Sequence, residues 1–462
     1  MSSSVDGLVS GLSTSSLISS LMQVEAAPQD RLKAKVSTAQ TAVSSYQSVN
    51  AKVAALETAA KGLRDLTTWR GIKATSTSPT VSATAVSSMS TMAGTTTFDV
   101  KNLAKSQITT SKVDPTAEIT QADSITITIG PADVVDEYGN VTDNSSKRKD
   151  TVIDLRDAKD RTAKGVADAI NAKGIGVKAT VVTTGGAENI LQFSGTKTGL
   201  DNAFTIGNFD PPTNTVAAAQ NALLKIGGGE ENGGYNVTSP TNSFTGLLTG
   251  VTVTVSKLED NVTIEATSDI QGIADKISAL VEAANAALGE IKTQTTYDAA
   301  TKKGQPLTGD FSVRNMAQTI LGTISQGVVY PNPDFDKNLP VDPVTNPETK
   351  SAGAYSQYGI ELTRSGTLQF KPEKFKEAYA KDPGTMQTVG VEIGKVFETL
   401  ANTQTKSLRS VIEGRKSEID VYNTQISNWD IRLASKRTAL QKHYSDLEVS
   451  LGKLKNQSNW LA

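Results

Sequence analysis

The chain has 462 residues, 37% hydrophobic and 5% aromatic, with a formal net charge of −2; this length exceeds one ordinary core, so we expect several domains with light cores. The near-neutral charge gives no basis for a nucleic-acid partner, and the absence of cysteine excludes disulfides, thiol nucleophiles and cysteine-ligated metals. No apolar run reaches the about 18 residues of a transmembrane helix and no basic residue precedes Arg31, so we expect neither membrane insertion nor a cleaved secretory signal.

The N-terminal region predicts two helices. The first spans 14–27, carries four apolar residues on one face, and is expected to stop at Pro28. The second is longer than an average helix, because its apolar residues step by threes and fours over more than thirty positions. The faces of the two helices are Leu17, Ile18, Leu21 and Met22, then Leu32, Val36, Ala39, Val43, Tyr46, Val49, Val53, Leu56, Ala60 and Leu63.

The middle of the chain, residues 72–268, predicts antiparallel sheets. Alternating β-branched runs occur at 125–129, 177–182 and 251–255, a pattern typical of half-exposed strands. A short helix is predicted at 162–174. We interpret this part as one or two β-rich domains.

Helical periodicity returns at Asp269, a reasonable N-cap, and continues to about residue 295. A loop rich in Pro, Asn and Asp follows at 331–349. The segment 358–370 predicts a hairpin that turns at Ser365–Gly366, and a helix is expected from about residue 372.

The C-terminal segment has the clearest pattern, an apolar residue at every seventh position from 419 to 454. Companions lie three residues on in its first half and four residues on in its second half, and Lys436 interrupts them. This drift is typical of a coiled-coil-like strip with changing partners. The strip consists of Ile419, Tyr422, Ile426, Trp429, Leu433, Leu440, Tyr444, Leu447, Leu451 and Leu454, and the chain closes on Trp460, Leu461 and Ala462.

These elements predict an α+β multidomain fold, in which both chain ends form one α-helical coiled-coil or bundle stem and antiparallel β-rich head domains are inserted between them. Both ends carry a net positive charge and the middle a net negative one, which suggests that the ends belong together. The predicted ranges are 1–40 (pairing with 416–462), 41–71 (pairing with 269–415), 72–105 and 245–268 as two parts of one head domain, 106–244 as an inserted β-rich head domain, 269–415 as a helical stem with a hairpin, and 416–462 as the C-terminal helix.

The sequence offers little that predicts catalysis. The single histidine, His443, lies on the C-terminal helix, where a solvated or inter-helix position is expected. The G-x-G-x-x-A string at 174–179 follows a helix and precedes a strand, so we interpret it as a turn and not as a dinucleotide site. A glycosidase-type pair among Glu259, Asp260 and Glu265 has no motif behind it. We therefore expect no enzymatic activity, no metal and no cofactor.

The terminal stripes differ from ordinary core, because a two-helix stalk cannot bury them within one chain. We predict that they pair with each other and with neighbouring molecules. The predicted interface residues are Leu17, Ile18, Leu21, Met22, Leu32, Val36, Val43, Ile419, Tyr422, Ile426, Trp429, Leu433, Leu440, Tyr444, Leu447, Leu451, Leu454, Trp460 and Leu461.

The chain resembles the flagellar hook-associated protein 2 (FliD) family, the caps of bacterial flagellar filaments. The resemblance lies in 5–32, in 247–291, in "PLTGDFSVRN" at 306–315, in 358–383, and in the ending "QSNWLA", where the family more often has Tyr in place of Trp460. It is loose across 106–245, although 164–206 resembles a module that flagellins share.

The resemblance implies a non-enzymatic cap at the distal, extracellular tip of the flagellum that promotes folding and insertion of flagellin and filament elongation. It implies a homo-oligomeric ring of about five or six subunits, contacts with flagellin and hook–filament junction proteins, and type III export without a cleaved signal. A cytoplasmic chaperone would bind the C-terminal segment, and the exposed head could serve adhesion to host glycans or mucin. The alternatives are flagellin or a junction protein and, from another class, a carboxylate-based glycan hydrolase.

Overall fold

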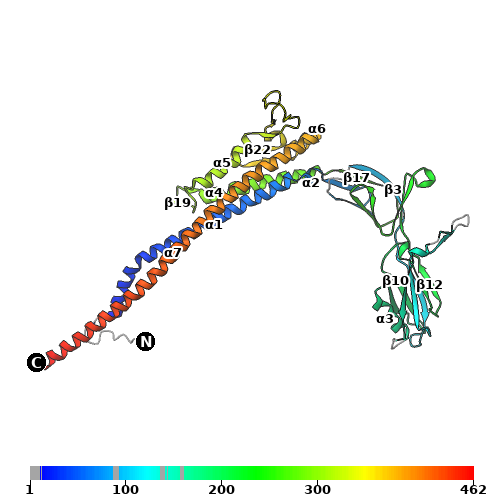
Figure 1. The fold of residues 1–462 in the computed structure, drawn as a ribbon, viewed down its shortest axis with the longest axis horizontal. Coiled ribbons are helices and arrows are strands. Elements are labelled where there is room, and N and C mark those ends of the chain that lie inside the picture. Colours follow the sequence, from blue (N-terminus) through cyan, green and yellow to red (C-terminus); the bar gives the residue numbers. More distant parts are fainter. Residues whose placement is uncertain are drawn as a thin grey trace. The chain divides into compact units, whose positions relative to one another are not determined.

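The computed structural model describes residues 11, 13–86, 93–135, 141–142, 144–156 and 161–461, with the backbone alone at 134–135, 141–142 and 460–461. The chain divides into two compact units, which we call the stem (residues 1–69 and 270–462) and the head (residues 70–269). The predicted fold class is confirmed, since the stem contains long helices from both ends of the chain and the head consists mainly of antiparallel sheets (Figure 1). In the described residues, no helix has the length and apolarity needed to cross a membrane.

Two long helices run along each other in the stem: α1 (Thr14–Arg64) and α7 (Pro383–Leu461). The Gln29 side chain contacts Asp430 and the Glu57 side chain contacts Asn402, so the partner's number falls along α7 as the number rises along α1. The pair is therefore antiparallel (Figure 1). At 1.5 Å per residue, α7 is roughly 120 Å long.

Two shorter helices, α4 (Ile270–Thr295) and α5 (Phe311–Ser325), cover part of this pair and share one apolar core with it. Ser48 of α1 donates to Oε1 of Glu290 on α4 at 2.6 Å. The hydroxyl of Tyr46 donates to Asp310, whose other carboxylate oxygen caps the start of α5.

Short elements complete the stem, and the predicted hairpin at 358–370 is confirmed. Its turn closes through bonds between Thr363 and Thr367, and Gly366 takes the positive φ (+78°) that favours glycine. The elements are α2 (Leu66–Trp69), β18 (Tyr297–Asp298), β19 (Lys303–Gly304), β20 (Val328–Pro331), β21 (Thr349–Gly353), the 3-10 turn η4 (Tyr355–Tyr358), β22 (Ile360–Leu362), β23 (Leu368–Phe370) and α6 (Pro372–Lys381).

The predicted helix end at Pro28 is wrong, because α1 continues through this proline. Proline removes one backbone hydrogen bond and crowds the preceding turn, at a cost of about 3 kcal/mol. Contacts with α7 offset that cost directly after the proline, since the buried Gln29 side chain donates to the carbonyl oxygen of Ile426 and to Asp430. Tertiary packing therefore outweighs the low helix propensity of proline at this position.

One core of the head lies among two sheets, with Phe98, Val253 and Ile264 buried in it. The sequence assigned β13 (Ala222–Ile226) and β14 (Tyr235–Ser239) to the insertion 106–244, yet both belong to the sheet of β3 (Gly94–Asn102). The first sheet has the order β1 (Ile72–Ser76), β17 (Glu259–Ser268), β3 (Gly94–Asn102), β13 (Ala222–Ile226), β14 (Tyr235–Ser239), and the second the order β15 (Ser243–Leu248), β16 (Val251–Val255), β2 (Val81–Ala85).

A second core of the head is built from the segment between β3 and β13. The helix α3 (Ala163–Lys173) ends at Gly174 in the left-handed region, and β9 begins at Val177, so the string at 174–179 is a helix-to-strand turn as predicted. One sheet has the order β12 (Thr213–Ala217), β4 (Ile108–Val113), β10 (Asn189–Gly195), β9 (Val177–Thr183), and the other has the order β11 (Phe204–Gly207), β5 (Ser124–Ile129), β8 (Lys149–Asp154). The same segment contains the short pair β6 (Val134–Val135), β7 (Val141–Thr142) and the 3-10 turns η1 (Ser145–Lys147) and η2 (Leu200–Asn202), whereas the turn η3 (Glu230–Asn232) joins β13 to β14.

Candidate assembly surface

The burial of the apolar stripes changes at one level of the stem. On α1 every stripe residue from Ala39 onward is buried, and on α7 the buried stripe ends at Ile412, with Ile419 only partly covered. In the antiparallel register these two ends lie within about two helical turns of each other. The reason is that α4 ends and α5 begins near this level, since Glu290 and Asp310 reach Ser48 and Tyr46. Beyond this level α1 and α7 continue without α4 and α5, and we call this part the two-helix segment (residues 14–38 and 419–461). In the register set by Gln29–Asp430 and Glu57–Asn402, α7 from about residue 446 onward extends past the start of α1 at Thr14.

Most of the predicted interface residues lie in the two-helix segment and are incompletely covered. Val43 is 8% exposed within the covered stem, and Ile18 is 7% exposed. Four others are exposed: Leu17 (46%), Leu21 (41%), Leu447 (41%) and Leu454 (61%). The half-buried members are Met22, Leu32, Val36, Ile419, Tyr422, Ile426, Trp429, Leu433, Leu440, Tyr444 and Leu451. The side chains of Trp460 and Leu461, and all of Ala462, lie outside the described part of the structure.

The line along which the stripes of α1 and α7 face each other in the two-helix segment is called the seam here. Polar residues at seam positions fix the register of the two helices, and the sequence reasoning missed most of them. Gln29, only 4% exposed, donates to Oδ1 of Asp430 at 2.5 Å. Glu25 forms an ion pair with Lys436, the residue that interrupts the stripe of α7. Glu25 and Gln29 continue the three-and-four spacing of the α1 stripe toward the N-terminus, and that spacing was the signal available in the sequence. Such polar contacts select one register at a cost in stability.

Two tyrosines of α1 and α7 are held by carboxylates near this level. Burial, followed by the hydrogen bond to Asp310, raises the pKa of Tyr46 to about 12. Further along α7, the hydroxyl of Tyr422 donates to Glu418 at 2.8 Å, and this bond raises the pKa of Tyr422. The Lys35 ammonium lies 5.5 Å from the centre of the Tyr422 ring, a cation–π contact that links the two helices.

The residues weighed for catalysis lie outside any assembled site. His443 is exposed on α7, with its ring edge-on to Tyr444 at 6.0 Å. Glu259 accepts hydrogen bonds from Ser78 and Thr80, which lower its pKa, whereas a general acid needs a raised one. Within the residues that the structure describes, no three histidine or carboxylate side chains are placed to hold a metal ion.

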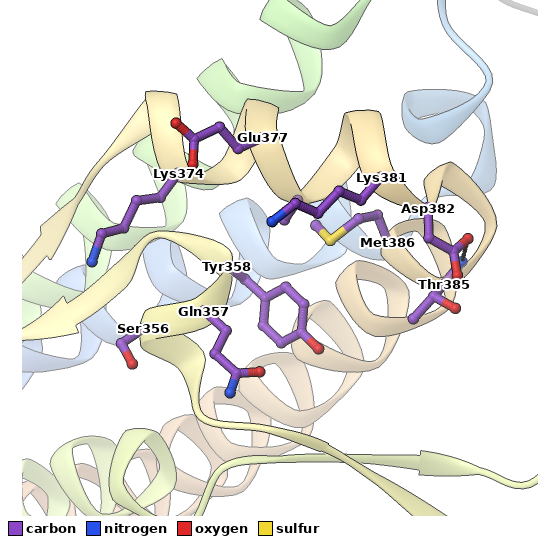
Figure 2. Close-up of a pocket in the computed structure, with 10 residues that line it drawn as sticks. Ser356, Gln357, Tyr358, Lys374, Glu377, Lys381, Asp382, Thr385 and Met386 are labelled. Atoms are coloured by element: carbon purple, nitrogen blue, oxygen red, sulfur yellow. Dashed lines mark hydrogen bonds between the residues drawn. The ribbon is translucent and has the colours of Figure 1, made fainter.

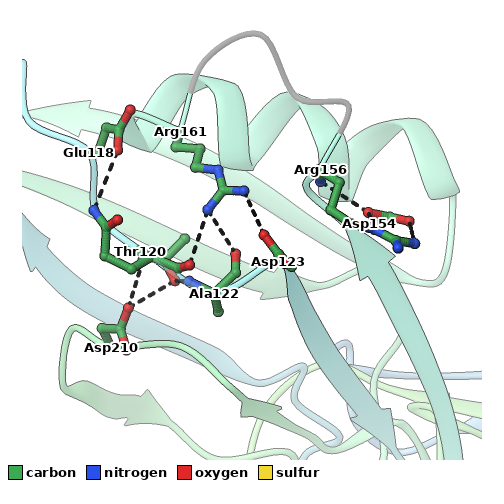
Figure 3. A network of polar contacts seen from close by, with 9 residues as sticks. Glu118, Thr120, Ala122, Asp123, Asp154, Arg156, Arg161 and Asp210 are labelled. Carbon is green, nitrogen blue, oxygen red and sulfur yellow. Dashed lines mark hydrogen bonds and ion pairs between the residues drawn. The ribbon is translucent and has the colours of Figure 1, made fainter.

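A network of polar contacts at the surface of the second part of the head is structural (Figure 3). The Arg161 guanidinium donates to the carbonyl oxygens of Gln121 and Ala122 and pairs with Asp123 at 2.9 Å. Asp210 accepts from the hydroxyl of Thr120 and from the backbone of Gln121, both at 3.0 Å. These bonds satisfy the backbone of the segment that precedes β5.

The fold and the seam together define a multidomain α+β protein whose two ends build one helical stem and leave it partly uncovered. Family models of this class match the chain in two stretches. Residues 10–107 match the "Flagellar hook-associated protein 2 N-terminus", and residues 219–457 match the "Flagellar hook-associated protein 2 C-terminus". The chain therefore belongs to the flagellar hook-associated protein 2 family. The unmatched stretch between the two matches contains β4 to β12, the second core of the head.

Individual relatives agree with this assignment. The chain is 24% identical to the A-type flagellar hook-associated protein 2 of Pseudomonas aeruginosa, over 98% of this chain and 96% of the relative. It is 23% identical to the lateral flagellar hook-associated protein 2 of Vibrio parahaemolyticus, over 72% of this chain and 69% of the relative. The crystal structure of the D1-D2-D3 domains of the Escherichia coli flagellar cap protein FliD has the same fold, with a TM-score of 0.57 at 21% identity, covering 80% of this chain and 99% of that one.

Proposed function

We propose that this chain is a non-enzymatic structural protein that caps the distal end of the bacterial flagellar filament as a homo-oligomer. In this role it sits outside the cell at the flagellar tip, reached by type III export with a C-terminal chaperone. There it promotes the folding and insertion of flagellin and thereby filament elongation. The family assignment supports the cap role, since the relative of known structure from Escherichia coli is a flagellar cap protein.

The observation that carries the proposal is the half-covered seam of the two-helix segment. Leu433 and Leu440 are only half-buried, and Leu447 and Leu454 remain 41% and 61% exposed. Apolar area left in water is available to a partner at roughly 25 cal/mol per Å². Helical subunits of a filament and neighbouring copies are partners that offer matching stripes. Because the apolar side chains of the seam are only partly buried in one chain, a partner can bury the rest and still dissociate again.

The direct experiment replaces two seam leucines, Leu440→Asp with Leu447→Asp, in the full chain. We expect filaments that lack a cap and cells that lose motility, while rings of the purified protein still form through the head. Thr438→Asp with Val449→Asp is the matched control, because each position lies two residues from a seam leucine and points about 200° away around the helix. Normal motility of the seam variant would contradict the proposal, and so would equal loss in the control.

Hydrogen exchange provides a second test that does not depend on mutation. Residues 14–38 and 419–461 should exchange faster in the isolated protein than in the assembled cap, because an isolated helix pair without full cover opens readily. Equal protection in both states would contradict docking through this segment. The proposal also expects the purified protein to form discrete caps, whereas a flagellin or junction protein would extend long filaments or insert below the tip.

A further inference from the structure

The loop that joins β20 to β21, residues 332–348, displays three aliphatic side chains to solvent. Leu339 is 56% exposed, Val341 63% and Val344 85%. A cluster of large apolar side chains at a loop tip is unusual for a free surface and marks an interface. We call this segment the aliphatic loop.

Buried amides hold the aliphatic loop in one shape. Asn346, 5% exposed, donates to the carbonyl oxygens of Asp336, Leu339 and Pro340 and accepts from the backbone N–H of Asp336 at 3.0 Å. Asn332, 8% exposed, donates to the carbonyl oxygen of Pro347 at 2.7 Å. A loop fixed in advance loses little conformational entropy when it binds, so its apolar tip is available for association.

A pocket of about 590 Å³ lies at the same level of the stem, between η4, α6 and the first turns of α7 (Figure 2). Tyr358, Ala378 and the buried Met386 supply its apolar lining. The Tyr358 hydroxyl donates to the carbonyl oxygen of Ala352, so the strand that ends the aliphatic loop borders the pocket. Figure 2 shows the carboxylate of Glu377 directed away from the Tyr358 ring.

The charges of the loop and the pocket also differ. The aliphatic loop carries Asp334, Asp336, Asp342 and Glu348 against one lysine, and hydrogen bonds from the backbone N–H groups of Thr345 and Val344 lower the pKa of Asp342. At the pocket, Lys374 already pairs with Glu361 at 2.7 Å, whereas Lys381 makes no ion pair with the described residues. Glu377 and Asp382 also line the pocket, so its formal charges balance, and Asp334 of the loop pairs with Lys350 at 2.6 Å. The complementary groups are therefore the Lys381 ammonium of the pocket and the remaining carboxylates of the loop.

We propose that the aliphatic loop of one copy docks into this pocket of a second copy. The contact is heterologous, with different surfaces on the two copies, and repeated heterologous contacts close into a ring when the rotation permits. In a ring, equivalent levels of neighbouring stems lie side by side, and the loop and the pocket share one level. The inference rests on the proposed function only in requiring a homo-oligomer.

Disulfide trapping tests the contact, and the native absence of cysteine keeps the background low. Full-length Val344→Cys and Lys381→Cys variants with different tags are mixed and oxidised. We expect a heterodimer at several times the yield of a control mixture in which Lys416→Cys, an exposed lysine further along α7, replaces Lys381→Cys. Yields equal to the control would overturn the proposal.

Mass photometry of full-length variants separates this contact from the function itself. Val344→Asp should raise the concentration needed for assembly at least tenfold, whereas Val329→Asp, on β20 of the same hairpin and 46% exposed, should leave it unchanged. If the unmodified chain assembles and Val344→Asp assembles equally well, the docking contact is overturned and the cap function stands. If the unmodified chain never forms a homo-oligomer, the proposed cap assembly itself fails.

Discussion

A single methyl group at Gly390 should break the packing between α7 and α2, the short helix that follows α1. A Cβ atom built on Gly390 would lie 1.7 Å from Cζ2 and 2.0 Å from Cη2 of Trp69. That overlap is too large for small adjustments, so in Gly390→Ala the indole ring has to leave its site. The ring is 3% exposed, its Nε1 donates to the carbonyl oxygen of Leu63 at 2.7 Å, and it meets Phe375 edge-on.

The expected cost follows from opposing effects. Losing the packing of a buried tryptophan costs about 3–5 kcal/mol when the side chain is deleted, and partial repacking recovers some of that. Alanine is favoured over glycine within a helix by about 1 kcal/mol. We expect Gly390→Ala to lower the free energy of unfolding of the stem by about 2–3 kcal/mol, which corresponds to a fall in Tm of roughly 5–10 °C.

Far-UV circular dichroism reports on this transition, because the long helices of the protein lie in the stem. Gly414→Ala is the matched control on the same helix, since its Cβ would meet nothing within 4 Å, and it should stabilise by about 0.5–1 kcal/mol. Trp69→Leu should remove most of the penalty of Gly390→Ala in a double-mutant cycle. If Gly390→Ala stabilised the stem as Gly414→Ala does, the close approach at Trp69 would be refuted.

Three further predictions concern the stem. Burial raises the pKa of Tyr355 to about 12, so with rising pH this tyrosine ionises in the unfolded chain before it does so in the folded stem. The stabilisation of the stem by neutral Tyr355 is therefore fully present below pH 10 and is lost between pH 10 and 12. Tyr355→Phe should reduce the fall in Tm over that interval, and a fall equal to that of the parent would count against this reasoning. Gln29→Ala should cost about 1–2 kcal/mol locally and speed hydrogen exchange at 20–36, whereas exchange unchanged there would exclude a clamping role. Asn346→Ala should expose the aliphatic loop to proteolysis at unchanged global Tm, and resistance equal to the parent would show that its amide is dispensable.

The sequence predicted the elements that depend on local periodicity. The stripe from Ile419 to Leu454 needs only a regular spacing to specify α7, and the alternation at 251–255 needs only two faces to specify β16. Gly366 specifies its own turn, because glycine alone adopts a positive φ without strain. Each of these features depends only on residues that are close together in the sequence.

Features that depend on a distant partner could not be predicted in the same way. Alternation indicates that β13 and β14 are strands but not that they return to β3 across the insertion. Pro28 predicts a helix end because its ring removes a backbone N–H group. The contact that keeps the helix continuous comes from Asp430, which lies 401 residues later in the sequence than its partner Gln29. Nothing in the sequence around Gly390 indicates that the indole ring of Trp69 occupies the space where a side chain at this position would lie.

The composition of the seam explains why the two ends of the stem differ in cover. Where α4 and α5 add a third layer, most of the buried stripe residues are aliphatic, as with Val49 and Leu408, and they are almost fully buried. Where that layer ends, the pattern admits Gln29 and Lys436, which prefer defined polar partners to a dry core. A purely aliphatic seam there would be stronger but free to slip or aggregate. Polar residues at intervals keep one register while the remaining leucines stay available. In the docking that we propose, the free energy would come from apolar area that folding of the single chain leaves uncovered.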